Sequence, residues 1–137
     1  MVGNLPQPYH ILVVDDDESC LSGEVAIIKR LGFKVAVGRN GREAVEKVKE
    51  MARKNQRFLG ILMDCNMPEM DGIEATKALR ELERTKEIEK QVIIAVTARV
   101  TNEKEFCLES GMNYFVEKPL SKSKLLPLLS EIMGIKK

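Results

Sequence analysis

The sequence contains few side chains that bind soft metals or form covalent cross-links. It has a single histidine, His10, and three cysteines, and no two of the cysteines form a CxxC pair. Cys20, Cys65 and Cys107 are odd in number and far apart along the chain, which favours reduced thiols over a disulfide framework or a zinc site. A single histidine also excludes a dinuclear centre with histidine ligands.

The sequence also lacks an excess of either charge, a long apolar run and the usual nucleotide-binding loop. With 22 Lys and Arg against 21 Asp and Glu, the net charge of +1 does not indicate nucleic acid as a partner. No apolar stretch approaches the length of a membrane span, and the amino terminus does not resemble a signal peptide. We therefore expect a cytoplasmic chain without membrane contact. The absence of a GxxxxGK[ST] loop and of kinase motifs indicates that the chain does not use ATP directly.

The sequence does contain a regular alternation of short apolar runs and longer helical patterns. Its 137 residues, 44% of them hydrophobic, suit one compact domain. The predicted strands are residues 10–14, 34–38, 59–63, 92–96 and 113–117, and three of these runs are apolar almost throughout, as in strands covered on both faces. The predicted helices are residues 18–31, 41–53 and 72–84, a short segment after Asn102, and a last segment from about Ser121.

Strand followed by helix, five times over, predicts a parallel α/β sheet with helices on both faces. We expect this domain to span residues 10–134, with a flexible lead or linker remnant at 1–9 and a short tail at 135–137. Pro127 falls inside the last helical pattern, where it removes a backbone hydrogen bond, so we expect a kink or a late helix start there.

Polar residues follow the apolar runs at the points where the strands should end. Asp15, Asp16 and Asp17 follow the first run, and Asp64 follows the third. Thr97 follows the fourth run, and Lys118 follows the fifth. Because ligands of open parallel sheets bind beyond the carboxyl ends of the strands, we expect these side chains to gather on one rim.

Carboxylates that lie within about 5 Å of one another in a partly dry cleft repel by several kcal/mol unless one is protonated or a cation lies between them. Oxygen ligands without nearby histidine or cysteine suit Mg²⁺. With Mg²⁺ and Lys118 both cationic, the rim is organised to receive an anion such as a phosphoryl group, to which Thr97 can donate a hydrogen bond. Asp64, held beside Mg²⁺, can attack phosphorus and form an aspartyl phosphate.

Four motifs in order carry a resemblance to a known family. They are "VVDD" (13–16), "MDCNMPEMDG" (63–72), "AVTA" (95–98) and "EKP" (117–119). Together they resemble the receiver domain of two-component response regulators, over about residues 9 to 133. The resemblance implies a flavodoxin-like (βα)5 fold, a doubly wound parallel sheet with strand order 2-1-3-4-5. The stretch "MDCNMPEMDGIEAT" is similar to receivers of hybrid histidine kinases, so the chain is either a stand-alone receiver or part of a larger kinase or regulator.

The resemblance also implies a role for each acidic site residue. Asp64 is the expected phosphoacceptor. Asp15 and Asp16 match the acidic pair that holds Mg²⁺, Asp16 directly and Asp15 largely through water. The backbone carbonyl of Asn66 is expected to complete the metal site.

The same resemblance implies a switch that responds to the phosphoryl group. Thr97 is the expected switch hydroxyl and Lys118 the expected partner of the phosphoryl group, with a cis bond between Lys118 and Pro119. Phe115 takes the place of the switch aromatic. Arg99 lies where the family has the entrance to the site, and we hypothesise that it tunes phosphoryl lifetime together with Asn66.

The function implied is that of a signalling switch rather than an enzyme with turnover. A histidine kinase or a histidine phosphotransfer protein would supply the phosphoryl group, and the face made by the fourth helix, fifth strand and fifth helix would change its partner preference. Two alternatives remain. A Mg²⁺-dependent phosphohydrolase with an aspartate nucleophile normally has a second acid where this chain has Asn66, and a flavodoxin-like FMN carrier needs a phosphate loop unlike the acidic "DDDESC".

Several other residues have simpler structural explanations. Asp17 and Asp71 are expected to cap helices rather than bind metal, and His10 to begin a strand. Cys65 is expected to be a packed or half-exposed thiol. The methionines near the motifs are expected to fill the core or line the cleft; they are Met63, Met67, Met70 and Met112.

Overall fold

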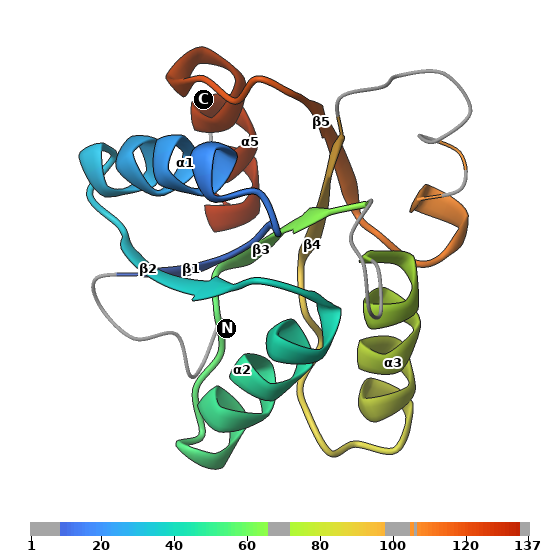
Figure 1. The fold of residues 1–137 in the computed structure, drawn as a ribbon. Helices are drawn as coiled ribbons and strands as arrows, with labels where there is room; N and C mark the ends of the chain where they lie inside the picture. The colour runs from blue at the N-terminus through green and yellow to red at the C-terminus, as the bar shows by residue number, and fades with distance from the viewer. Residues whose placement is uncertain (1–8, 66–71, 98–104, 106, 135–137) are drawn as a thin grey trace.

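The computed structural model describes residues 9–65, 72–97, 105 and 107–134, and its centre is a five-stranded parallel sheet (Figure 1). The strands are β1 (His10–Val14), β2 (Lys34–Gly38), β3 (Gly60–Asp64), β4 (Ile93–Thr97) and β5 (Tyr114–Glu117). Their order in the sheet is β2-β1-β3-β4-β5, which confirms the predicted fold.

Two strands end one residue later than predicted. β3 includes Asp64 and β4 includes Thr97, because these residues still pair with their neighbours, Asp64 with Val96 and Thr97 with Glu117. The two polar side chains are therefore held by the sheet itself rather than by the loops that follow it.

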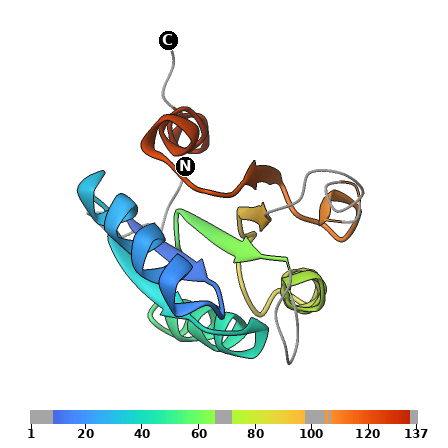
Figure 2. The same cartoon turned by 45° about the horizontal axis from the view of Figure 1, so that its top comes forward.

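Four described helices cover the sheet in two layers, and residues 107–109 are also helical. The four helices are α1 (Glu18–Arg30), α2 (Gly41–Arg53), α3 (Gly72–Arg84) and α5 (Lys122–Met133). Figure 1 shows α1 and α5 on one face of the sheet and α2 and α3 on the other, and Figure 2 shows the same layers in a turned view. Each of the described helices is too short or too polar to span a lipid bilayer.

The strands supply side chains to both layers, because successive residues of a strand point to opposite faces. In β1, Ile11 and Val13 belong to the apolar cluster under α1 and α5, whereas Leu12 and Val14 belong to the cluster under α2 and α3. All four are at most 1% exposed. This double burial explains why the run is apolar without alternation.

Polar caps fix where the helices begin. The Asp17 carboxylate accepts hydrogen bonds from the backbone of Ser19 and Cys20, at 2.9 and 3.4 Å. Asn40 caps the start of α2 in the same way, and Ser121 caps the start of α5. The expected capping role of Asp17 is confirmed, and its side chain is thereby committed to the helix rather than to a ligand.

Of the two outcomes expected at Pro127, a kink or a late helix start, the late start is wrong. Ser121 accepts a hydrogen bond from the backbone of Lys124 and starts α5 at Lys122, so Pro127 lies within the helix. The carbonyl that lacks its usual partner is that of Ser123, which is exposed, as is Pro127. Water can satisfy that carbonyl, and the helix continues past the proline.

Arg80 ties α3 to the segments that precede β4 and β5. Its guanidinium donates to the carbonyl oxygen of Gly111 at 2.6 and 2.9 Å, to that of Gln91 at 2.9 Å, and to the Asn113 side chain at 2.8 Å. The Asn113 oxygen also accepts from the backbone of Ile93 at 2.8 Å. A single side chain of α3 thus satisfies polar groups of two separate segments, one before β4 and one before β5.

Replacing Arg80 with methionine should lower the free energy of unfolding by about 2 kcal/mol, because it leaves partly buried carbonyl groups without a donor. The matched control is Arg84→Met, one turn along the same helix, whose side chain is 72% exposed and pairs only with Glu81 in the described interactions. That control should change stability by less than about 0.5 kcal/mol. Urea denaturation followed by circular dichroism measures both, and equal losses would contradict this account of Arg80.

Candidate functional site

Three carboxylates meet at the carboxyl end of the sheet, two from the residues directly after β1 and one from the last residue of β3. Each of Asp15, Asp16 and Asp64 offers an oxygen, and these oxygens lie within 4.8 Å of one another. Asp15 and Asp64 are buried, at 1% and 6% exposure, whereas Asp16 is exposed. The convergence follows from the pairing of β1 with β3, in which Val14 lies level with Met63. The predicted acidic cluster is confirmed as a spatial cluster.

Lys118 brings a positive charge to two of these carboxylates. Its Nζ lies 3.0 Å from Oδ2 of Asp15 and 3.6 Å from Oδ2 of Asp64. Burial lowers the pKa of Lys118, but the hydrogen bond to Asp15 and the charges of Asp64 and Asp15 outweigh it and raise that pKa above its ordinary value. The amine is therefore cationic at neutral pH.

The backbone around Lys118 holds this amine in place. The Lys118 N–H donates to the carbonyl of Thr97 at 2.8 Å, and the bond to Pro119 is cis, as predicted. Lys124 then donates to the carbonyls of Glu117 and Pro119, both at 2.9 Å. The turn between β5 and α5 is thus anchored on both sides of the lysine.

Glu24 is a fourth carboxyl at this site, and the sequence analysis missed it. It lies on α1, is 6% exposed, and lines the same hollow as Lys118. Burial, followed by the charge of Asp15, raises the pKa of Glu24 to about 8. The sequence feature that could have indicated its burial is its position three residues after Leu21 and four before Ile28. This spacing places it on the stripe of α1 that faces the sheet.

Thr97 and Phe115 lie on the same face of neighbouring strands. Thr97 is 1% exposed at the end of β4. Phe115 of β5 is partly buried and packs against the cluster under α2 and α3. In the sheet, Phe115 is level with Ala95, two residues before Thr97, so both side chains point to the side covered by α3.

The comparisons with known proteins decide the family. A family model described as the response regulator receiver domain matches residues 11–130. The chain belongs to the response regulator receiver family. Two-component response regulator ARR22 of Arabidopsis thaliana is 38% identical to this receiver domain over 125 residues, covering 90% of this chain and 82% of that protein.

The receiver domain also resembles parts of much longer kinases. Hybrid signal transduction histidine kinase B of Dictyostelium discoideum is 42% identical over 125 residues, covering 85% of this chain but 6% of that kinase. Among solved structures, the receiver domain of sensor histidine kinase PA1611 from Pseudomonas aeruginosa PAO1 has 31% identity and a TM-score of 0.78, covering 92% of this chain and 98% of that one. That crystal structure has a magnesium ion coordinated in its active-site cleft.

Some predicted residues of the receiver domain lie outside the described part of the chain. They are Asn66, Met67, Met70, Asp71, Arg99 and Asn102. Within the described part, Cys65, Met63 and Met112 are buried in the core, as predicted. His10 begins β1, at the sheet end opposite the carboxylates, which confirms its expected place.

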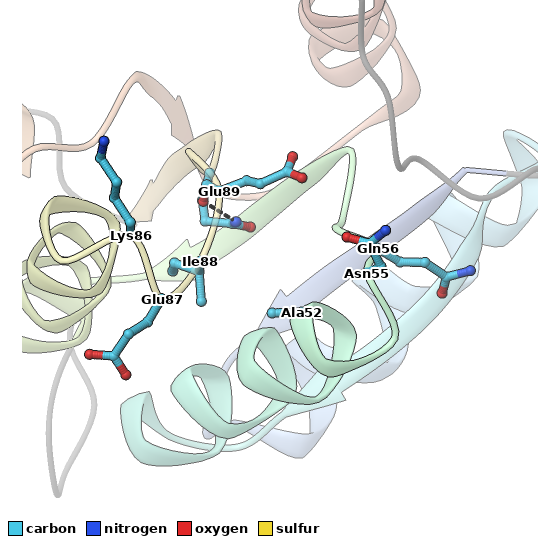
Figure 3. Close-up of a pocket in the computed structure, with 8 residues that line it drawn as sticks. Ala52, Asn55, Gln56, Lys86, Glu87, Ile88 and Glu89 are labelled. Atoms are coloured by element: carbon cyan, nitrogen blue, oxygen red, sulfur yellow. Dashed lines mark hydrogen bonds between the residues drawn. The ribbon is translucent and has the colours of Figure 1, made fainter.

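Two hollows lie at opposite ends of the sheet of the receiver domain. One, of about 480 Å³, lies between α1 and the turn after β5, and both Glu24 and Lys118 line it. Another, of about 400 Å³, lies at the opposite end of the sheet between the turns after α2 and α3. Figure 3 shows Ala52 and Ile88 facing each other there, with Lys86 and Glu87 turned outward. None of the three clustered carboxylates lines either hollow, but Lys118, which pairs with two of them, lines the first.

Proposed function

We propose that this receiver domain takes a phosphoryl group from a phosphohistidine onto Asp64 in a Mg²⁺-dependent reaction and thereby switches its preference for partners. The observation that carries the proposal is the cluster itself, three carboxylates with oxygens within 4.8 Å of one another and a lysine amine that forms ion pairs with two of them. The donor would be a histidine kinase or a histidine phosphotransfer protein, and the setting would be the cytoplasm.

The donor set fits magnesium. Asp15, Asp16 and Asp64 offer only carboxylate oxygens, and no histidine or cysteine belongs to the described cluster. These three residues, together with the backbone carbonyl of Asn66, would hold the ion. When bound, Mg²⁺ supplies positive charge that offsets the charge of the transferring phosphoryl group.

The transfer itself can be written for the residues of this chain. An oxygen of Asp64 forms a bond to phosphorus as the bond between phosphorus and the histidine nitrogen breaks, and that nitrogen keeps the electron pair. Lys118, already within 3.6 Å of Asp64, would pair with the phosphoryl oxygens. A partly buried cation near the reacting atoms favours the transition state because it needs little rearrangement there.

The switch would act through the fourth helix, β5 and α5. Thr97 would donate a hydrogen bond from its hydroxyl group to a phosphoryl oxygen, and Phe115 would move into the space that Thr97 vacates. The same-face placement of these two side chains supports this coupling. Downstream effectors would read the resulting surface, and slow hydrolysis of the aspartyl phosphate would reset it.

The test is phosphorylation by a small donor that contains a phosphorus–nitrogen bond, phosphoramidate. With Mg²⁺ the wild-type chain should gain one phosphoryl group by intact mass, and hydroxylamine should remove it. EDTA or Asp64→Ala should abolish the gain. The control is Asp17→Asn, which changes the neighbouring acid but keeps a helix-capping oxygen, and it should be phosphorylated like the wild type. Equal modification of Asp64→Ala, or catalytic release of phosphate from a small phosphoester, would contradict the proposal.

A further inference from the structure

Lys118 reaches the carboxylates from the end of an edge strand. It follows β5, which lies at the edge of the described sheet and pairs with β4. The backbone N–H of Lys118 donates to the carbonyl of Thr97, which ties this point of the chain to β4. On its outer side, an edge strand has no neighbouring strand with which its backbone can pair. Contacts from outside the sheet must therefore fix the backbone of Lys118 on that side.

The side chain of Lys124 supplies such contacts. Its Nζ donates to the carbonyl oxygens of Glu117 and Pro119, at 2.9 Å in both cases. These carbonyl groups belong to the residues directly before and directly after Lys118. Lys124 lies in the first turn of α5, where its backbone N–H donates to Oγ of Ser121 at 3.3 Å. One side chain thus joins both flanks of Lys118 to the start of α5.

The start of α5 is a firm base for these hydrogen bonds. Leu125, which follows Lys124, is fully buried and belongs with Leu129 to the apolar cluster under α1 and α5. On its α1 side, the turn after β5 borders the hollow of about 480 Å³, and both Lys118 and Pro119 line that hollow. Close packing therefore gives these two residues little support there, and hydrogen bonds carry more of the constraint.

The position of the turn, more than the hydrogen bonding of its carbonyl groups, depends on Lys124. Its side chain is exposed, so water can satisfy either carbonyl group in its absence. A water molecule does not tie both carbonyl groups to one point on α5. Position matters because the amine of Lys118 lies 3.0 Å from Oδ2 of Asp15 and 3.6 Å from Oδ2 of Asp64. Displacement of a reacting group by about 1 Å can slow a reaction on the order of 100-fold.

We propose that Lys124 is a positioning residue for phosphoryl transfer, which holds the backbone of Lys118 where its amine reaches Asp64. This inference rests on the proposed function and extends it to a side chain whose described hydrogen bonds are with backbone carbonyl groups of the turn. The carboxylates of Asp15, Asp16 and Asp64 lie on or directly after β1 and β3, away from this turn. The rate of transfer should therefore depend on Lys124, whereas metal binding should not.

The experiment measures phosphorylation of the full chain by phosphoramidate in Mg²⁺, as intact mass against time. Lys124→Met should slow phosphorylation about tenfold, because the turn that carries Lys118 is then free to shift. Lys122→Met removes an exposed lysine from the same turn of α5, so it controls for the loss of one positive charge and should stay within about twofold of the wild type. Lys124→Arg keeps a cation that can donate to two carbonyl groups and should restore the rate to within about threefold of the wild type.

Calorimetry with Mg²⁺ alone separates positioning from damage to the fold. Lys124→Met should bind Mg²⁺ at least as tightly as the wild type, because the carboxylates are unchanged and the amine of Lys118 is held less firmly beside them. Slower transfer with undiminished Mg²⁺ affinity supports the inference. Equal rates for Lys124→Met and Lys122→Met, a Lys124→Arg rate as low as that of Lys124→Met, or parallel loss of rate and Mg²⁺ affinity would overturn it. Failure of the proposed function would look different, because the wild-type chain itself would then gain no phosphoryl group, and both proposals would fall.

Discussion

Replacing Gly72 with alanine should slow phosphorylation of Asp64 on the order of 10²-fold and destabilise the domain by about 2 kcal/mol. A Cβ atom at this first residue of α3 would lie 2.2 Å from the carbonyl oxygen of Asp64 and 3.1 Å from its carbonyl carbon. It would also lie 3.0 Å from Cγ of the Met63 side chain, but the two Asp64 atoms belong to the backbone, so a side-chain rotation cannot relieve that contact. Either α3 or the end of β3 must therefore shift. A shift of β3 would displace Asp64, the proposed phosphoacceptor.

The matched control is Gly60→Ala at the other end of β3. A Cβ there would meet the Ile94 side chain at 3.5 Å, an ordinary van der Waals distance. That variant should be phosphorylated at close to the wild-type rate. Phosphoramidate labelling in Mg²⁺, followed by intact mass against time, measures both variants. A Gly72→Ala rate within about twofold of the wild type would contradict the claim that close approach at Gly72 positions Asp64.

The second large effect is a pH dependence of stability that Glu24 should impose in the absence of metal. Its pKa is raised from 4.5 to about 8 in the folded chain. The folded state therefore binds more protons than the unfolded state between these two values, and the stability that Glu24 contributes falls as pH rises through that window. The slope is on the order of 1.4 kcal/mol per pH unit at most.

The comparison that isolates this effect is wild type against Glu24→Gln, by urea denaturation in EDTA at pH 5, 6, 7 and 8. The charged groups that face Glu24 are Asp15, Asp64 and Lys118, and they are common to both chains. The two proteins should have similar stability at pH 5, and the glutamine variant should be the more stable by several kcal/mol at pH 8. Parallel stability curves would show that the carboxyl does not titrate in this way.

The residues that could be predicted from sequence are those whose positions follow from the sheet. A parallel sheet brings the carboxyl ends of its strands to one edge. The positions of the apolar runs were therefore enough to predict that Asp15, Asp64 and Lys118 lie close together. The predicted ends of β3 and β4 were one residue too early. A run that is buried on both faces has no alternation of polar and apolar residues to mark its last paired residue.

Glu24 and Gly72 were missed for a different reason, since their importance depends on contacts between separate elements. Glu24 lies in a helix whose sequence mixes Ser, Gly and Glu with apolar residues, and only its place beside Lys118 in the folded chain shows that it lies at the site. Gly72 was visible at the end of "MDCNMPEMDG", but the sequence does not reveal that its missing side chain leaves room for the backbone of Asp64.

Calorimetric titration of the chain with Mg²⁺ tests the central claim, that carboxylates from β1 and β3 together form one divalent cation site. The wild type should bind one Mg²⁺ ion. Asp16→Asn and Asp64→Asn should each weaken binding strongly, because each removes a charged ligand, while Asp17→Asn should leave it unchanged. Absence of Mg²⁺ uptake by the wild type, or uptake that survives the loss of both ligands, would contradict the account.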